Sequence, residues 1–153
     1  MLRVKTRLGL SRIDGIGLFA DQHIPRDTIV WEFNPLIDLK LREDEIASLA
    51  EGARQQVQKY SYRDELSGLY IFCGDDARFF NHSEEPNCVD VSWGPFGGRT
   101  IAGRDIRQGE ELTCNYASFD KDFMTGQYRL PERQVGRSMV PMMHTPRRPA
   151  EKR

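Results

Sequence analysis

The side chains best suited to bind a ligand or to take part in a reaction lie in one short segment, 78–88. It reads Arg-Phe-Phe-Asn-His-Ser-Glu-Glu-Pro-Asn-Cys. Asn and Ser side chains bond to nearby backbone in preference to joining a regular ladder. The segment is therefore predicted to leave a buried aromatic pair and to form a tight polar loop. His82 alone would more often be a structural histidine, but between Asn81 and Ser83, with Asn87 following Pro86, we interpret it as functional. Such a loop can hold a ligand.

Short apolar or β-branched runs, separated by Gly, Pro, Asn and Asp, dominate the rest of the chain and predict a mostly-β fold. Turns are predicted at Gly74–Asp76 and at Gly94–Gly98. Strands do not alternate with long helices, which argues against a parallel doubly wound sheet. The predicted strands are Leu18–Ala20, Thr28–Phe33, Leu69–Cys73, Val89–Trp93, Arg99–Ala102 and Glu111–Asn115.

One helical region is expected between these strands. Arg42–Ala50 begins with three consecutive carboxylates, 43–45, which suit the positive end of a helix. A continuation over Ala53–Tyr60 is predicted after Gly52. The sequence therefore predicts a small helical insert in a sheet protein.

Charge divides the chain into a body and a tail. The 153 residues hold 22 Lys and Arg against 23 Asp and Glu, but residues 131–153 carry 6 basic and 2 acidic side chains. We expect one domain over residues 1–130 and a basic, mobile tail over 131–153. An acidic body argues against direct nucleic-acid binding and is compatible with a basic peptide partner. Nucleic-acid binding through the tail is the least favoured alternative.

Cysteine usage and hydropathy bear on location. Cys73, Cys88 and Cys114 are odd in number and widely spaced, so neither a disulfide framework nor a zinc site is indicated. The sequence has neither an apolar run of transmembrane length nor an N-terminal apolar stretch typical of a signal peptide. We expect a cytoplasmic protein in a reduced compartment without membrane contact, and a nuclear or host-delivered location stays open.

Four motifs in fixed order carry a family resemblance. Asp14–Ala20 reads Asp-Gly-Ile-Gly-Leu-Phe-Ala, Arg78–Ser83 and Pro86–Cys88 follow, and Gly109–Tyr116 reads Gly-Glu-Glu-Leu-Thr-Cys-Asn-Tyr. Together they resemble the SET-domain protein lysine methyltransferases, from about Leu10 to about Phe123. The resemblance implies short curved sheets, a threaded pseudoknot loop and a small helical insert. It also implies methyl transfer from S-adenosylmethionine to a lysine ε-amine of a protein, and a histone or histone-like protein is a candidate substrate.

The resemblance assigns roles to individual residues. It implies that the Gly15–Gly17 backbone lies close against the cofactor, as glycines without a Cβ allow. Asn81 and His82 would hold the two ends of the cofactor. The full cofactor-binding set implied is Gly15, Ile16, Gly17, Arg78, Phe79, Asn81, His82 and Tyr116.

Tyr116 matches the family's catalytic tyrosine. Methyl transfer to an amine is an in-line displacement, so alignment alone is worth roughly 7–11 kcal/mol. Neutralising a free lysine at pH 7 costs about 4.6 kcal/mol, which a desolvated channel beside a sulfonium supplies. Tyr116 is expected to position the reacting groups electrostatically, without serving as a strong base. Candidates for the channel wall are Tyr70, Cys114 and Phe119, with Tyr60 and Tyr62 as further tyrosines before the loop.

The sequence departs from many relatives at the zinc-binding positions. Glu84 stands where many carry a cysteine after Asn-His-Ser, and no cysteine follows Cys114, so no metal site is expected. Phe119, Phe123 or Tyr128 would then cover the cofactor. Cys114 stands where relatives place the Phe or Tyr that influences how many methyl groups fit.

Two functional classes stay open at this stage. The favoured class is an enzyme acting on an extended lysine-containing segment of a protein, and the alternative is a non-catalytic SET-like module that binds a basic tail. Glu110 and Glu111 are not interpreted as a catalytic pair, because adjacent strand residues face opposite ways. The sequence leaves the oligomeric state undetermined.

Overall fold

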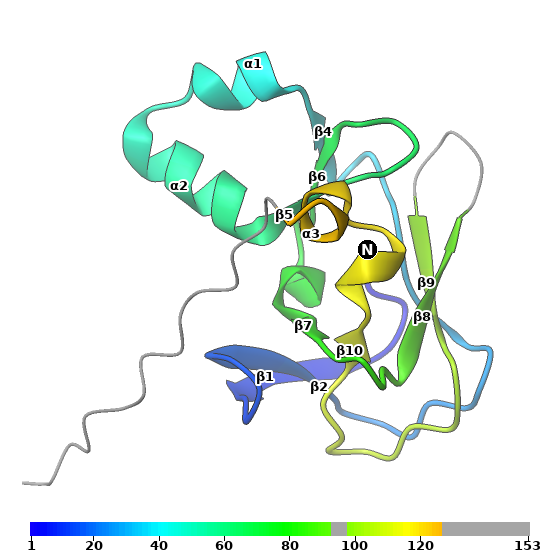
Figure 1. The fold of residues 1–153 in the computed structure, drawn as a ribbon. Helices are drawn as coiled ribbons and strands as arrows, with labels where there is room; N and C mark the ends of the chain where they lie inside the picture. The colour runs from blue at the N-terminus through cyan, green and yellow to red at the C-terminus, as the bar shows by residue number, and fades with distance from the viewer. Residues whose placement is uncertain (93–97, 127–153) are drawn as a thin grey trace, which may run out of the picture.

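The computed structural model describes residues 1–92 and 98–126. The elements follow one another along the chain in the order drawn in Figure 1. They are β1 (Thr6–Leu10), β2 (Ile16–Ala20), β3 (Ile29–Glu32), β4 (Leu39–Leu41), α1 (Glu43–Ala47), α2 (Glu51–Tyr60), β5 (Ser61–Arg63), β6 (Tyr70–Phe72), η1 (Asp76–Phe79), β7 (Asn81–His82), β8 (Cys88–Ser92), β9 (Gly98–Ala102), β10 (Thr113–Cys114), η3 (Tyr116–Ser118) and α3 (Lys121–Met124).

The strands form small separate sheets. β1 pairs with β2, β7 with β10, β3–β9–β8 form one three-stranded sheet, and β4–β6–β5 form another. All pairs are antiparallel except β7 with β10, which run parallel. Figure 1 shows β7 and β10 side by side near the middle, with the β1–β2 hairpin on one side and α3 on the other. The mostly-β prediction is confirmed.

The helical insert differs in detail from its prediction. Helices form over α1 and α2, but the interruption lies at residues 48–50 and Gly52 is inside α2. At the start of α1, the Arg42 N–H donates to the Glu45 carboxylate at 2.8 Å, which closes a capping interaction. The expected break at Gly52 is therefore wrong, because one exposed glycine weakens a helix by only about 1 kcal/mol.

Several elements escaped the sequence analysis because they are short or lack a pattern. β1, β4, β5, β7 and α3 were not predicted as such, and α3 has only 4 residues. Most of the predicted reversal at residues 94–98, and all of the predicted tail over 131–153, lie outside the described residues.

The core consists of two clusters of buried residues, and Leu2 and Phe80 pack against both. Aliphatic side chains of β2, β3 and the segment before β10 fill the larger one, including Leu18, Val30 and Leu112, all fully buried. Cys88 and Cys114 belong to the same cluster, while Cys73 joins Trp31 and Ile71 in the second. All three cysteines are free thiols in apolar surroundings. They serve as small core residues.

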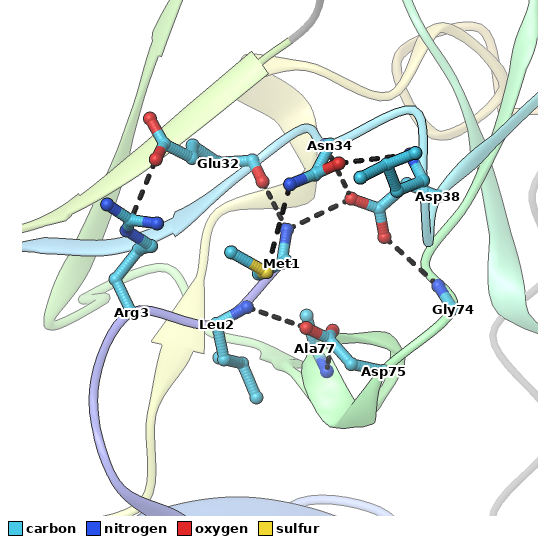
Figure 2. A network of polar contacts seen from close by, with 10 residues as sticks. Met1, Leu2, Arg3, Glu32, Asn34, Asp38, Gly74, Asp75 and Ala77 are labelled. Carbon is cyan, nitrogen blue, oxygen red and sulfur yellow. Dashed lines mark hydrogen bonds and ion pairs between the residues drawn. The ribbon is translucent and has the colours of Figure 1, made fainter.

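A polar network ties the first residues to the turn that leads into the central strands (Figure 2). The Asp38 side chain is completely buried, and its oxygens accept hydrogen bonds from the Met1 amino group at 2.9 Å and the Gly74 N–H at 3.0 Å. The Leu2 N–H donates to the Asp75 carboxylate at 2.6 Å, and Asp75 also caps η1 by accepting from Ala77. The network therefore fixes where η1 begins.

Candidate functional site

The polar loop predicted from the sequence forms a parallel ladder with a distant segment. In the register of β7 and β10, Asn81 lies opposite Thr113 and His82 opposite Cys114. Beyond the ladder, the Ser83 N–H donates to the Cys114 carbonyl at 3.0 Å. The Asn-His-Ser motif therefore runs beside the chain that follows Gly-Glu-Glu-Leu.

Asn87 holds the other end of the loop to the same segment. Its side chain is buried, donates to the Glu111 carbonyl at 2.7 Å and accepts from the Thr113 N–H at 2.9 Å. The Asn87 N–H also donates to the Thr113 hydroxyl at 3.2 Å. Because both ends of the loop bond to residues 111–114, the position of each motif depends on the other.

Glu111 joins the loop to the glycine motif, a role that the sequence analysis missed. One carboxylate oxygen accepts from the Asn81 amide at 2.8 Å, and the other accepts from the Ser11 hydroxyl at 3.0 Å. A Cβ on Gly17 would lie 2.2 Å from the Glu111 carboxylate oxygen, so only glycine fits there without a shift. The space that Gly17 leaves is therefore filled by Glu111 of the same chain.

The glycine motif forms an exposed shelf beside Asn81. Gly15 has φ +45°, a left-handed conformation that favours glycine. The Asn81 amide lies 3.1 Å from the Asp14 carbonyl and 3.4 Å from the Ile16 carbonyl. The Ile16 side chain remains 47% exposed above this backbone, so the shelf is open to a ligand.

His82 and Tyr116 are coupled directly. The Tyr116 N–H donates to His82 Nδ1 at 3.2 Å, which in the neutral imidazole leaves the proton on Nε2. The two rings lie 5.3 Å apart, and Phe123 of α3 contacts both, at 4.8 Å from His82 and 5.7 Å from Tyr116. The Tyr116 hydroxyl donates to the Phe80 carbonyl at 2.5 Å. This bond fixes the orientation of the hydroxyl at the cavity that Tyr116 lines.

Tyr116, Cys114 and Phe119 line one cavity, together with Arg78. Its volume is about 80 Å³, several times the 10–15 Å³ that one water molecule needs. Its walls are largely aromatic, because Trp31, Tyr60, Tyr62 and Phe80 contribute to them as well.

Tyr70, expected in the channel wall, is not among the residues that line this cavity. Its hydroxyl donates to the Asp122 carboxylate at 3.2 Å, and the Arg63 guanidinium lies over its ring. This cluster fixes α3 against β5 and β6. Phe79 also lies outside the cavity lining. Its ring centroid lies 5.4 Å from that of Tyr60, and the Arg78 guanidinium lies over the Phe79 ring, 5.3 Å from its centroid.

Burial shapes the electrostatics of the cavity. It raises the pKa of the Tyr62 hydroxyl and of the Cys73 and Cys114 thiols well above their ordinary values, so all three stay neutral. Burial also raises the pKa of Asp90 to about 6, although a hydrogen bond from Thr100 opposes the shift. Cations lie where the cavity reaches solvent, at the exposed Lys59 and the half-buried Arg78.

These residues fit the chemistry of S-adenosylmethionine. Arg78 and Lys59 provide cations for a carboxylate, and the rings of His82 and Phe123 provide faces for an aromatic base. Residues 14–16 are exposed beside them, although the carbonyls of Asp14, Gly15 and Ile16 already accept hydrogen bonds from Asn81 and Ser11. In the parts of the chain that the structure describes, no group of three or more His, Cys, Asp or Glu side chains is arranged to hold a metal ion. No helix in those parts is long and apolar enough to cross a membrane.

Comparison with known proteins bears on both fold and activity. A family model described as SET domain matches residues 15–117. The chain is 34% identical over 122 residues to the Schizosaccharomyces pombe histone-lysine N-methyltransferase specific for H3 lysine-36, covering 73% of this chain and 14% of that protein. It is 31% identical over 131 residues to Homo sapiens histone-lysine N-methyltransferase 2D, covering 81% of this chain and 2% of that protein.

A solved structure agrees with the sequence relatives. The chain matches Polycomb Repressive Complex 2 of Chaetomium thermophilum with a TM-score of 0.61 and 26% identity, covering 81% of this chain and 17% of that one. The chain thus spans only a small part of these relatives.

The expected cytoplasmic location is wrong. The relatives are named as histone methyltransferases, and histones are packed in chromatin, which points to the nucleus.

The order of the motifs, the sheets that bring them together and these matches agree with one another. The family model covers all four motifs up to Tyr116 except Asp14, and the matched structure superposes over 81% of this chain. The chain belongs to the SET domain family.

Proposed function

We propose that this chain transfers a methyl group from S-adenosylmethionine to a lysine ε-amine of a histone. The names of its relatives support the reaction and the substrate class, since they include enzymes specific for lysine 36 and for lysine 4 of histone H3. The cavity supports the proposal independently, because its aromatic walls suit a long aliphatic side chain that ends in a cation.

When bound, S-adenosylmethionine supplies a reactive methyl group on a positively charged sulfur. Asn81 and His82 would hold it beside the Gly15–Gly17 shelf, with Arg78 toward its carboxylate. Phe123 would cover it from α3, and Phe119 would close the cavity between Tyr62 and Tyr116. The domain would extend to about residue 130.

The Tyr116 hydroxyl is the observation that carries the proposal. Its proton is directed at the Phe80 carbonyl, so its oxygen can accept a bond from a lysine N–H or face the methyl group. A hydroxyl fixed in this way orients the nitrogen without taking its proton. The aromatic lining favours the neutral amine by desolvation, and the proton would pass to solvent.

A labelled-methyl assay tests the proposal. The full chain is incubated with radiolabelled S-adenosylmethionine and recombinant histone octamers, alongside the Tyr116→Phe variant. We expect transfer to lysine by the wild type and a loss of about 100-fold or more in the variant, comparable to removing one preorganised group from an active site.

Tyr70→Phe is the matched comparison, because it removes a tyrosine hydroxyl that lies outside the cavity lining. Its transfer rate should stay within about threefold of the wild type, the range expected when no transition-state contact is lost. The proposal fails if the folded wild type labels no histone, or if Tyr116→Phe transfers methyl groups as fast as the wild type. Histone binding without transfer would identify a non-catalytic module.

A further inference from the structure

Strand β8 points its side chains the opposite way from what its sequence pattern favours. Alternation along Val89, Asp90 and Val91 ordinarily buries the valines and exposes the aspartate. Here Val89 and Val91 are 40% and 39% exposed, while Asp90 lines the interior cavity. Breaks of a local rule in this way are expected at functional or strained sites.

Asp90 belongs to a row of three side chains across the sheet β3–β9–β8. Thr100 of β9 lies opposite Trp31 of β3 on one side and opposite Asp90 of β8 on the other. Directly opposed residues share one face of a sheet, and all three line the cavity. The Thr100 hydroxyl donates to Asp90 Oδ1 at 2.9 Å, which fixes the carboxylate in the row.

Two buried polar atoms in this row have no hydrogen-bond partner among the residues that the structure describes. They are Asp90 Oδ2, an acceptor, and Trp31 Nε1, a donor. A buried group left unpaired destabilises a protein by about 1–3 kcal/mol, so such groups call for a partner outside the fold. The carboxylate is the stronger requirement, because it is the charged one.

The interior groups around Asp90 include no cation that could pair with its carboxylate in place of a ligand. The titratable and charged groups that line the cavity with Asp90 are Tyr60 of α2, the Tyr62 hydroxyl of β5, the Cys73 thiol after β6, the Cys114 thiol of β10, Tyr116 of η3 and Asp120 before α3, with Lys59 and Arg78 at the solvent end. None of the interior groups is a cation. Aromatic rings and a carboxylate with one oxygen lacking a partner among the described residues make a site for an aliphatic chain that ends in an N–H donor.

We propose that Asp90 is a specificity-determining residue that sets how many methyl groups the substrate lysine receives. The inference rests on the proposed function. Asp90 Oδ2 accepts a hydrogen bond from a lysine nitrogen that still carries hydrogen, and so orients the remaining lone pair toward the methyl donor. A primary or secondary amine has such an N–H, whereas the tertiary amine of dimethyllysine has none.

The number of hydrogens left on the lysine nitrogen after each methyl transfer sets how many methyl groups are added. The lysine nitrogen forms a bond to the methyl carbon, the carbon–sulfur bond breaks with its electron pair left on sulfur, and the new ammonium loses one proton to solvent. After two rounds, the neutral nitrogen has no hydrogen for Asp90. We therefore expect monomethyllysine and dimethyllysine as products, with slow conversion to trimethyllysine.

Initial rates on defined peptides test this directly. Histone H3 peptides centred on lysine 36 or lysine 4, each unmodified, monomethylated or dimethylated, are offered to the full chain with S-adenosylmethionine. For the wild type, the dimethylated peptide should react at least about tenfold more slowly than the other two, the factor that about 1.4 kcal/mol represents. In Asp90→Val, which removes the acceptor from a β-compatible position, this ratio should fall below about threefold.

Asp44→Asn is the control, because Asp44 is an exposed carboxylate on α1 paired with Arg42 and lies outside the cavity lining. It should keep the wild-type ratio. A wild type that methylates all three peptides equally well overturns the proposal, and so does an Asp90→Val variant with the wild-type ratio.

A binding measurement separates this inference from the proposed function. With S-adenosylhomocysteine present, calorimetry at pH 7.5 compares a monomethyllysine peptide with the same peptide carrying norleucine, which has no nitrogen. Asp90→Asn should weaken the monomethyllysine peptide about tenfold or more and leave the norleucine peptide unchanged. Equal losses for both peptides, or no loss for either, would overturn the proposed contact between Asp90 and the lysine nitrogen. If the wild type transfers no methyl group at all, the proposed function fails while this comparison still tests Asp90.

Discussion

The polar loop 81–87, which we propose holds the cofactor, and the interior cavity differ in how their polar groups are paired. In the loop, the Asn81 side chain bonds to the Glu111 carboxylate, and the Asn87 side chain bonds to the Glu111 carbonyl. Glu111 also accepts from Ser11, in the turn between β1 and β2. In the cavity, Asp90 and Trp31 each keep a buried polar atom without a partner among the described residues. Paired groups hold the backbone in place, whereas unpaired groups indicate where a ligand supplies the missing partner.

The largest expected effect comes from removing the hydrogen bonds that hold the polar loop 81–87. Asn87→Ala removes the partner of the Glu111 carbonyl and of the Thr113 N–H, and Thr113 is buried. We expect the free energy of unfolding to fall by about 2–5 kcal/mol, because buried backbone groups are left unpaired. Urea unfolding followed by circular dichroism measures the change.

Asn115→Ala is the matched control for Asn87. Asn115 caps η3 by accepting from the Ala117 N–H, a contact exposed to solvent. Losing an exposed cap lowers stability by about 1 kcal/mol. Similar losses in both variants would contradict the special place given to the paired loop.

The second effect concerns Asp90 in the cavity, where a substitution is expected to raise the free energy of unfolding instead of lowering it. Burial raises the pKa of Asp90 from 3.8 in the unfolded chain to about 6. Between these values the folded protein holds a proton that the unfolded chain has released, so stability falls as pH rises through this window. Above pH 6 the penalty is complete, and two pKa units correspond to about 3 kcal/mol.

Asp90→Asn cannot ionise and should therefore be more stable than the wild type at pH 7.5, by up to about 3 kcal/mol. The difference should shrink toward zero near pH 4, where the wild-type carboxyl is protonated in the fold. Urea unfolding at pH 4, 5, 6 and 7.5 measures it. A variant that is less stable than the wild type at pH 7.5 would mean that Asp90 already has a strong partner.

A smaller effect tests the contact between Gly17 and Glu111, which joins the polar loop to the glycine motif. Gly17→Ala places a Cβ 2.2 Å from the Glu111 carboxylate and should push that side chain away from Asn81. We expect an interaction energy of about 1–2 kcal/mol between Gly17→Ala and Glu111→Ala, because residues in contact are not additive. Additive losses in a double-mutant cycle would show that Gly17 is required for another reason.

The loop and its partner strand were predictable because their residues have few structural uses. Asn81, His82 and Asn87 stand at spacings that regular structure does not require, and the Gly-Glu-Glu-Leu segment that precedes Tyr116 completes the pattern. Glu111 was not predicted, since a strand pattern does not reveal which of two neighbouring carboxylates turns toward Gly17. The contact between Gly17 and Glu111 appears only once the chain is folded.

Asp90 was not predictable from the pattern of its own strand. Its inward orientation depends on the register of β8 with β9, which places it opposite Thr100. Tyr70 is the opposite case, because it was predicted in the channel wall but does not line the cavity. Its place before the loop indicated the channel, but α3 was not predicted, and Asp122 of that helix bonds its hydroxyl. Register and long-range packing decide both cases.

The most direct test is a crystal structure of the full chain with S-adenosylhomocysteine and a monomethyllysine peptide of histone H3. The account predicts that the lysine side chain fills the aromatic cavity, with its nitrogen within hydrogen-bond distance of both the Tyr116 hydroxyl and Asp90 Oδ2. A lysine bound outside the cavity would contradict the proposed site. A lysine inside it, with Asp90 turned away or bonded only to water, would contradict the role given to the unpaired carboxylate.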